Sequence, residues 1–464
     1  MPAQRFESLP IAVIGGGPVG LAAAAHLVSR NLPVKLYEAG ADVGTSMRDW
    51  GHVRVFTPWR YCVDGASAAL LERQGWAMPS ADVFPTGGEI VREYLEPLAA
   101  TPELSGIIET GARVTAVSRL GLDKVVSRGR AERPFVLSVK TAAGTRRDLV
   151  QAVIDASGTW ATPNPLGSSG LPAEGEMEFA ERIAYGIPDV LGRHRDVYAG
   201  RTTLVVGAGH SAANALLDLD RLAKTEPDTA AIWATRGTNL ARIFSGGDAD
   251  QLPARGELGA ETRSLVESAR TPLVAGFAIL ALRQEDGRIM VDGETAEGPR
   301  TIGPVDRIIA ATGQRPDLSL TRELRLDLDP WLESTKALGL LIDPNEHSCG
   351  SVPPHGHREL AHLEPGFYTV GIKSYGRAPT FLLLTGYEQV RSVVAALAGD
   401  MTAADNVHLV LPETGVCTTT FSVADSGGAG CCGGPAPARA DACCVADAVA
   451  KDQGKKGCGC GVAA

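Results

Sequence analysis

The stretch from Ile11 to Gly40 constrains the fold most strongly, because it combines a strand, a glycine turn and a helix at fixed spacing. It opens with a continuous apolar run, Ile11–Ile14, which predicts a buried parallel strand. A segment rich in helix formers, Leu21–Arg30, follows. The turn between them has the pattern G-x-G-x-x-G, formed by Gly15, Gly17 and Gly20. Glycines at these positions let a pyrophosphate approach the backbone and let the helix pack closely on the strand.

A second strand and an acidic residue complete this pattern. Val34–Tyr37 predicts a strand that ends in Glu38, about 20 residues beyond the glycines, where a carboxylate accepts hydrogen bonds from an adenosine ribose. Free N–H groups at the start of the preceding helix attract phosphate. The combination predicts a dinucleotide site, which we assign to FAD. The alternative is a glycine-rich turn of an ordinary α/β protein with a structural glutamate.

A second nucleotide-binding pattern begins near residue 200. Thr203–Val206 predicts a strand, and Ala213–Leu222 continues as a helix. The turn between them is G-x-G-x-x-A, formed by Gly207, Gly209 and Ala212, and it is compatible with a nicotinamide dinucleotide. The next strand leads to Arg236 in place of an acid. A guanidinium suits a 2′-phosphate and therefore favours NADPH over NADH, although an arginine at a strand end is often simply solvated.

Three later segments are expected to return to these two sites. Each is an apolar strand that ends in a turn, and they are Ala152–Gly158, Asp306–Gly313 and Phe367–Gly371. Their last glycines, Gly158, Gly313 and Gly371, are candidate cofactor contacts; a plain strand end is the alternative for Gly158. A helix predicted over Gly386–Leu397 presents its N-terminus to the flavin or only closes the domain.

We therefore expect an α/β fold with two Rossmann-like dinucleotide-binding domains, one for FAD and one for NADPH, the second inserted in the first. A length of 464 residues fits two or three domains. The expected FAD-binding domain comprises residues 1–165 and a return segment, 311–410. The NADPH-binding domain spans 166–310, and 411–464 forms a flexible Cys-rich C-terminal tail.

The region after the first βαβ unit is less regular. Helices are expected over Ala66–Gln74 and Gly88–Leu98, and alternating segments predict antiparallel strands at Gly111–Val117 and Pro134–Lys140. Aromatic residues gather between residues 40 and 85 and line either a flavin or substrate pocket or a core layer over the sheet. Candidates for a flavin-facing pocket are His52, Arg54 and Trp59. Catalytic side chains stay unassigned.

Charge and hydropathy exclude some classes of function. The formal net charge of −10, without a basic stripe, argues against a nucleic-acid partner. Residues 1–10 carry both charge signs and do not resemble a targeting segment. The apolar stretch Thr271–Leu282 is too short to cross a bilayer. We expect a cytoplasmic protein with a small-molecule substrate and no membrane partner, and a homodimer is one option for its assembly.

Cysteines concentrate at the C-terminal end. Cys62 and Cys349 are the two that precede residue 400, and seven lie in the last 48 residues. Six of these form three close pairs: Cys431 with Cys432, Cys443 with Cys444, and Cys458 with Cys460. Such spacing is not that of a zinc finger, and close thiolates suit As(III) or another thiophilic ion. The alternatives are a redox relay through a tail disulfide and a tail whose thiols do nothing specific.

The motifs also carry a family resemblance. Two glycine fingerprints separated by IDASG, with AATGQRP afterwards, resemble the two-dinucleotide-binding flavoprotein superfamily over residues 8 to about 400. Three segments are similar to parts of the flavin-containing monooxygenase-like proteins of arsenic-resistance operons: WGHVRVFTPW, GIPDVLG and VVGAGHSAANALLDL. The tail is similar to thiol-rich extensions of arsenic-handling proteins. The resemblance implies FAD at Gly15, Gly17, Gly20 and Glu38, and NADPH at Gly207, Gly209, Ser211 and Arg236.

Two departures from the family pattern bear on the chemistry. The F-x-G-x-x-x-H signature of the monooxygenase branch is missing between Trp160 and Val206, so the resemblance alone does not secure oxygenation. No C-x₂-C or C-x₄-C dithiol lies near the flavin segments, where Cys62 stands alone. This disfavours a disulfide reductase or mercuric reductase that uses an internal dithiol.

The sequence therefore indicates an FAD-dependent, NADPH-using oxidoreductase of the flavin monooxygenase type. An arsenical or another soft, thiophilic substrate captured by the tail is the candidate substrate. The first alternative is an NADPH-dependent reductase of a thiol-bound metal(loid) or of a tail disulfide. The second, from another class, is a metal(loid)-sequestering flavoprotein.

Overall fold

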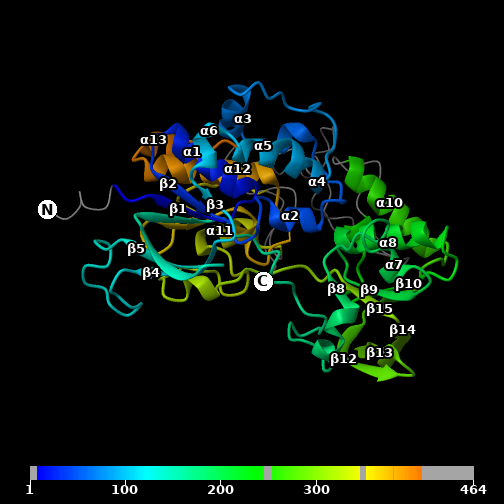
Figure 1. Ribbon diagram of the computed structural model, residues 1–464. Coiled ribbons are helices and arrows are strands. Elements are labelled where there is room, and N and C mark those ends of the chain that lie inside the picture. Colours follow the sequence, from blue (N-terminus) through cyan, green and yellow to red (C-terminus); the bar gives the residue numbers. More distant parts are fainter. Residues whose placement is uncertain (1–7, 245–252, 345–351, 380, 410–464) are drawn as a thin grey trace, which may run out of the picture.

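The computed structural model describes residues 8–244, 253–344, 352–379 and 381–409. Two α/β units, each built around a parallel five-stranded sheet, form the two lobes of Figure 1. The strands of the second sheet lie between Ile183 and Ala310, whereas the first sheet combines strands that precede Ser157 with one strand near residue 368. The second unit is thus inserted into the first. Cys349 and the tail from residue 411, with its six paired cysteines, lie outside the described residues.

The first sheet has the strand order β16-β7-β1-β2-β3. Its strands are β1 (Ile11–Ile14), β2 (Val34–Tyr37), β3 (Ile108–Glu109), β7 (Ala152–Asp155) and β16 (Phe367–Thr369). All residues of β1 and β7 are buried, as expected for parallel strands covered on both faces. The predicted strands Ile11–Ile14 and Val34–Tyr37 are confirmed residue for residue, because each is a short apolar run bounded by turn residues.

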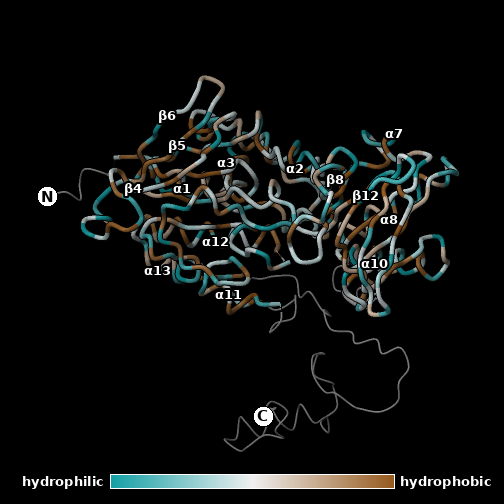
Figure 2. Tube along the Cα trace, turned by 90° about the horizontal axis from the view of Figure 1, so that it is seen from below, coloured by the Kyte–Doolittle hydropathy of each residue, from teal (hydrophilic) through white to brown (hydrophobic). Residues whose placement is uncertain are grey.

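One face of this sheet is covered by helices. α1 (Pro18–Ser29) packs against α12 (Leu383–Leu397), and Figures 1 and 2 show the two helices in the same layer. α1 begins before the predicted Leu21, because Gly17 serves as its N-cap and Pro18 occupies its first position. The shorter helices of this unit are α2 (Thr45–Asp49), α3 (Gly65–Glu72), α4 (Gly87–Ile90), α5 (Glu96–Ala99), α6 (Pro102–Ser105), α11 (Lys336–Ile342) and α13 (Met401–Asp405).

The predicted continuous helix over Gly88–Leu98 is wrong in one respect. It is divided into α4, a π-helical turn (Val91–Leu95) and α5. Pro97 has no N–H, so it cannot donate to the carbonyl of Glu93 four residues earlier. The indole of Trp76 donates to that carbonyl instead, at 2.8 Å. The proline and the tryptophan together account for the interruption.

An antiparallel sheet covers the other face. It contains β4 (Arg113–Arg119), β5 (Phe135–Thr141) and β6 (Gly144–Val150). Leu137 and Val139 pack against Ala12 and Val153 of the parallel sheet. The two predicted strands are confirmed with bounds shifted by one or two residues. β6 was not predicted, because its sequence, GTRRDLV, is mostly polar and exposed.

The second parallel sheet has the order β11-β10-β9-β15-β8. Its strands are β8 (Ile183–Tyr185), β9 (Thr202–Val206), β10 (Ala230–Thr235), β11 (Leu273–Ala275) and β15 (Arg307–Ala310). The helices of this unit are α7 (Arg195–Tyr198), α8 (His210–Ala223), α9 (Ala241–Phe244) and α10 (Pro253–Glu267). A three-stranded antiparallel sheet, β12 (Ala278–Glu285), β13 (Arg288–Thr295) and β14 (Gly298–Val305), extends from its lower end in Figure 1.

Two antiparallel segments connect the units. Asn164 donates its backbone N–H to the carbonyl of Gly313 at 2.9 Å, and the Thr312 hydroxyl donates to the carbonyl of Asn164 at 2.6 Å. Gly313, a candidate cofactor contact, thus lies in this connection with φ +83°. Among the described residues, no helix is long and apolar enough to span a membrane.

Candidate functional site: two glycine turns and the pocket between the units

Close backbone contacts shape the first glycine turn. Gly15 has φ +105°, and a Cβ there would lie 2.6 Å from the carbonyl oxygen of Ala156, just after β7. A Cβ on Gly20 would lie 1.9 Å from the carbonyl oxygen of Gly15. Only glycine fits both positions without a shift of the backbone. These glycines therefore allow β1, α1 and the end of β7 to pack together.

Gly17 lies beside open space. Its φ of −80° and ψ of −175° are extended, and a Cβ there would meet no protein atom within 4 Å. Gly17 is the N-cap of α1, and no side chain in the described ranges caps this helix. The N–H groups of the first turn and the space beside Gly17 form a cradle that fits a phosphate.

Glu38 stands beside this cradle at the end of β2. It is 9% exposed. Its Oε2 accepts the N–H of Gly16 at 2.6 Å, and its Oε1 accepts the N–H of Gly40 at 2.7 Å. These bonds fix the carboxylate, and each oxygen keeps a lone pair for a ribose hydroxyl. The first unit therefore has the residues that a dinucleotide such as FAD requires.

The second glycine turn repeats this geometry. Gly207 has φ +135°, and a Cβ there would lie 2.2 Å from the carbonyl oxygen of Ala311, after β15. Gly209 is the N-cap of α8, extended and open, and no described side chain caps the helix. Ala212 takes the place that Gly20 has in the first unit, and it is fully buried. The second unit thus offers a cradle of the same kind.

The remaining residues predicted for the second site lie near this cradle or at the end of β10. Ser211 is in the first turn of α8, next to His210, whose ring packs edge-on against Phe56 of the first unit with centroids 5.1 Å apart. Arg236 follows β10, is exposed, and donates to the carbonyl of Ser168 at 3.1 Å. Its guanidinium has further N–H donors, so it fits a 2′-phosphate.

A buried ion pair joins the ends of β7 and β16. Lys373 Nζ lies 2.8 Å from Asp155 Oδ2 and donates to Ser157 Oγ at 2.9 Å. The side chains of Lys373 and Asp155 are 1% and 0% exposed. Gly158 follows with φ +72° and open space at its Cβ position. The pair therefore fixes the turn that passes beside Gly15.

The start of α12 lies against the first turn of α1. A Cβ on Gly386 would lie 2.5 Å from Val19, and one on Gly371 (φ +70°) would lie 3.4 Å from the same side chain. No side chain in the described part of the chain caps α12. Two helix N-termini and the turn after β16 thus meet at one edge of the sheet, where open α/β sheets bind ligands.

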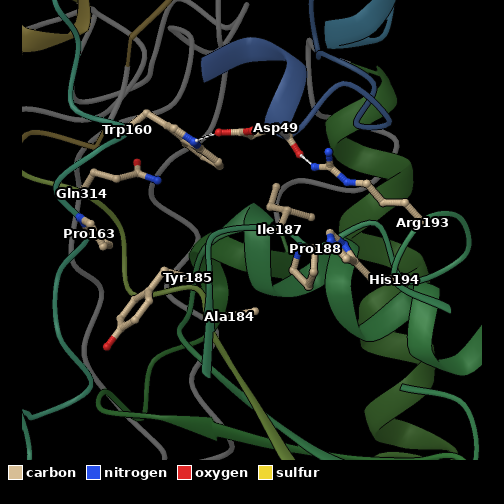
Figure 3. Close-up of a pocket in the computed structure, with 10 residues that line it drawn as sticks. All are labelled: Asp49, Trp160, Pro163, Ala184, Tyr185, Ile187, Pro188, Arg193, His194 and Gln314. Carbon is tan, nitrogen blue, oxygen red and sulfur yellow. Dashed lines mark hydrogen bonds between the residues drawn. The ribbon is translucent and has the colours of Figure 1, made fainter. Parts of the chain in front are cut away.

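A cavity of about 220 Å³ lies where the two units meet. Figure 3 shows Trp160 donating its indole N–H to Asp49 Oδ2, at 2.9 Å, and Arg193 donating to the backbone carbonyl of Asp49. The cavity is smaller than a pocket for a drug-sized ligand, so it suits a small molecule or one ring of a larger one. Its lining residues are Asp49, Trp160, Pro163, Ala184, Tyr185, Ile187, Pro188, Arg193, His194 and Gln314.

The loop that carries Arg193 and His194 is held by Asp189. The Asp189 carboxylate accepts the N–H groups of Gly192 and Arg193 at 2.9 and 3.1 Å. His194 Nδ1 accepts the N–H of Asp189 at 3.1 Å, so Nδ1 carries no proton and Nε2 is the N–H donor. Burial, with Arg193 nearby, lowers the pKa of His194. The ring therefore stays neutral at neutral pH.

The three residues predicted for a flavin-facing pocket have different surroundings. His52 faces the Asp189 loop, and its pKa is lowered mainly by burial and also by Arg193 and His194. Its Nε2 is buried and has no hydrogen-bond partner among the described residues. Arg54 is exposed and donates to the carbonyl of Phe84. Trp59 is 2% exposed and belongs to the hydrophobic core.

Cys62 is the free cysteine of the described residues, and it is fully buried. Burial raises the pKa of its thiol to about 11. Its Sγ lies 3.5 Å from the Thr57 hydroxyl. A protonated, inaccessible thiol is inert. The seven cysteines beyond residue 400 lie in the part of the chain that the structure does not describe.

Several residues of the site had no signal in the sequence that singled them out. Asp49, Trp160 and Arg193 meet only through the arrangement of the two units, since they are far apart in the sequence. Lys373 also looks like a surface residue, because its partner Asp155 lies 218 positions away. The one local signal was Asp189 followed by Gly192, a turn in which a carboxylate accepts backbone N–H groups.

Comparisons with known proteins agree with this geometry. Residues 13–73 match the NAD(P)-binding Rossmann-like domain family. A ferredoxin–NADP reductase of Streptococcus equi subsp. zooepidemicus is 26% identical over 224 residues, which are 48% of this chain and 54% of that protein. The chain thus spans about half the length of the first curated relatives it matches.

Solved structures match over most of the described chain. The bacillithiol disulfide reductase of Bacillus cereus has a TM-score of 0.63 at 16% identity and covers 84% of this chain and 99% of its own. The flavin-containing monooxygenase of Stenotrophomonas maltophilia has a TM-score of 0.54 at 19% identity and covers 85% and 99%. At such identities the likeness shows the fold alone, that is, the arrangement of two α/β units.

Proposed function

We propose that the chain is an FAD-dependent oxidoreductase that takes electrons from NADPH and is of the flavin monooxygenase type. The observation that carries this proposal is the pair of open glycine cradles, at Gly17 and Gly209, on two units with a pocket between them. The reductases and the monooxygenase among the similar proteins support the class.

Each unit has the residues for one cofactor. In the first, the N–H groups at the start of α1 hold a pyrophosphate and Glu38 binds a ribose. In the second, the start of α8 holds the pyrophosphate and Arg236 the 2′-phosphate of NADPH. Bound FAD supplies hydride acceptance and electron transfer to O₂ or to another acceptor. Trp160 and Ile187 line the pocket between the units.

The state of the described cysteine favours an acceptor other than an internal dithiol. Cys62 is buried, its pKa is raised to about 11, and within the described ranges no second cysteine accompanies it. Electrons therefore pass to O₂ or to a group outside the described residues. We take O₂ as the acceptor and a soft nucleophile, such as a trivalent arsenical, as the oxygenated substrate. The support for the substrate is the sequence alone, with its paired cysteines between Cys431 and Cys460.

A second candidate is an NADPH-dependent reductase of a tail disulfide or of a metal(loid) bound to the tail thiols. The specific observation that favours it is the higher TM-score with a disulfide reductase, 0.63 against 0.54 for the monooxygenase. In this case O₂ is not needed. Free thiols appear on the tail cysteines during turnover, because the disulfide is reduced or the metal(loid) leaves its thiol ligands.

One experiment separates the two candidates. The FAD-loaded full chain is mixed with NADPH, with and without arsenite or methylarsonous acid, in air and under argon. Five quantities are followed: NADPH loss, O₂ uptake, free thiols, arsenical bound to the protein and oxygenated arsenical formed. The proposal expects O₂ uptake that is coupled to an oxygenated arsenical. NADPH loss under argon with new thiols supports the reductase, and stoichiometric arsenical binding without turnover supports a sequestering flavoprotein.

A truncation provides the matched control for the tail. Removing the residues after Ala424 deletes six paired cysteines and leaves the described body intact. If the tail captures the substrate, the truncated chain keeps NADPH oxidation and has a higher KM for the arsenical. An unchanged KM would contradict the tail's part in the proposal.

A further inference from the structure

A buried hydrogen-bond network around Gln389 lies at the edge of the sheet that the flavin occupies in the proposed function. Gln389 is in the second turn of α12 and is fully buried. Its Oε1 accepts the N–H of Gly371 at 2.8 Å. Its Nε2 donates to Ser374 Oγ and to His355 Nε2, each at 3.0 Å. One side chain thus joins α12 to the turn after β16 and to the segment that precedes β16.

The protons of this network follow from its chemistry. His355 Nδ1 lies 3.0 Å from the carbonyl oxygen of Pro353, which can only accept, so Nδ1 carries the proton. The neutral ring therefore offers the lone pair of Nε2 to the Gln389 amide. Ser374 donates its hydroxyl to the carbonyl of Gly371 at 2.7 Å. Both backbone polar groups of Gly371 are thereby held.

Gly371 is close to the phosphate cradle. Its Cβ position lies 3.4 Å from Val19, in the first turn of α1, and that turn begins at Gly17. A Cβ on Gly386, in the first turn of α12, would lie 2.5 Å from the same valine. A displacement of the Gly371 turn therefore changes the contact with Val19 that supports the first turn of α1.

We infer that Gln389 and His355 are positioning residues for the flavin: they set the Gly371 turn against the first turn of α1, and they hold it only while His355 is neutral. The inference rests on the proposed function, because it takes the first unit to be the FAD site.

A second proton on His355 does not fit the network. The new Nε2–H would face the N–H of the Gln389 amide, and the ring is 2% exposed, so water cannot accept the proton. Rotating the amide by half a turn would provide an acceptor for the imidazolium. It would also turn the Gln389 Nε2 toward the N–H of Gly371, so that two donors face each other and the hydrogen bond to the Gly371 turn is lost.

The charged groups around the His355 ring do not reverse its preference for the neutral form. Glu359, on the same segment, accepts the N–H of Gly356, and Glu388 of α12 is paired with Arg391. Both carboxylates favour the charged ring, but burial is the larger effect and lowers the pKa of His355. The ring of Tyr375 packs against His355 with centroids 5.8 Å apart.

The direction of the pH effect follows from this lowered pKa. The held turn binds fewer protons than the released turn, in which His355 titrates near the ordinary value of about 6.5. Acidification through and below that value therefore favours the released turn. FAD affinity of the wild-type protein is expected to fall over the same interval.

Gln389→Glu is the decisive variant, because it keeps the shape of the side chain and the acceptor for Gly371. The new carboxylate faces His355 Nε2 and stabilises the imidazolium, which reverses the pH preference. The carboxylate cannot make the two hydrogen bonds that the Gln389 amide donates to Ser374 and His355, so Q389E should bind FAD at least about tenfold more weakly than wild type near pH 8. Its affinity should recover toward about pH 6, where the wild-type affinity falls.

Gln151→Glu is the matched control. The Gln151 amide donates to the carbonyl of Leu9 at 2.6 Å, at the amino end of the same sheet. Q151E makes the same chemical change away from the cofactor edge, so it should keep the wild-type pH profile of FAD binding. The readouts are the dissociation constant of FAD, from fluorescence quenching at each pH, and the thermal unfolding of the apoprotein.

The outcomes are distinguishable. Wild-type protein that binds no FAD at any pH contradicts the proposed function. Wild-type protein that binds FAD, together with a Q389E profile parallel to its own or an inverted profile in Q151E, overturns the inference. If Q389E does not fold, His355→Gln decides, because it keeps an acceptor for Gln389 without a titrating ring. In H355Q, the affinity for FAD should no longer fall on acidification. If it still falls as in the wild-type protein, the inference is overturned.

Discussion

Replacing Gly17 with alanine adds one methyl group to the phosphate cradle and disturbs nothing else in the protein. The backbone at Gly17 is extended, which alanine adopts readily, and its Cβ would meet no protein atom within 4 Å. The apoprotein should therefore be as stable as wild type. It could gain about 0.4–1 kcal/mol, because alanine restricts the unfolded chain more than glycine does.

The loss falls on the ligand. A methyl group beside the N-cap keeps a phosphate oxygen from reaching the N–H groups of the first turn of α1 at a hydrogen-bond distance of about 2.9 Å. Each hydrogen bond to a charged group is worth about 1.5–3 kcal/mol. Losing one such bond raises the dissociation constant of FAD by about 10- to 150-fold.

Gly209→Ala is the matched variant, since Gly209 is extended, open and the N-cap of α8. G17A should weaken FAD binding, measured by fluorescence titration of the apoprotein, with little change in thermal unfolding. G209A should retain FAD and raise the KM for NADPH. The reasoning is refuted if G17A binds FAD as tightly as wild type, or if both variants weaken FAD to the same extent.

Three further predictions use other parts of the site. Lys373→Met should destabilise the apoprotein by about 3–5 kcal/mol in urea unfolding, because it leaves Asp155 as an unpaired buried charge. Adding Asp155→Asn should recover most of the lost stability, and an additive loss in the double variant would contradict the pairing. Arg236→Ala should raise the KM for NADPH about tenfold and leave the KM for NADH unchanged. An equal rise in the KM for both cofactors would exclude a contact with the 2′-phosphate. Cys62→Ser should leave NADPH oxidation unchanged, and thiol reagents should not label Cys62 in the folded protein, since its pKa is raised to about 11; labelling at the rate of a free thiol would show that the residue is accessible.

The strands and turns of the two glycine patterns were predictable because local sequence specifies them. The run Ile11–Ile14 is apolar at every position, and a Cβ on Gly20 would lie 1.9 Å from the carbonyl oxygen of Gly15, five residues earlier. The strand β9 and the start of α8 follow the same rule in the second unit. Physical constraints that act over a few residues can be read directly from the sequence.

Other features depend on contacts between distant segments. The division of the helix near Glu93 results partly from Pro97, which the sequence shows, and partly from the Trp76 indole, which only the fold brings there. Polar residues of β6 make contacts with distant segments: Asp148 accepts the Tyr37 hydroxyl, and Arg146 donates to Glu109. The pocket between the units needs Asp49 to meet a loop about 140 residues later, a pairing that no local pattern contains.

The central claim is that the first unit binds FAD and the second delivers electrons to it from NADPH. The most direct measurement is an anaerobic titration of the purified full chain with FAD, followed by NADPH, with the visible absorbance of the flavin as the signal. The account predicts tight uptake of one FAD per chain and loss of the oxidised flavin absorbance when NADPH is added. A protein that takes up no FAD, or whose bound flavin keeps its oxidised absorbance in excess NADPH, would contradict it.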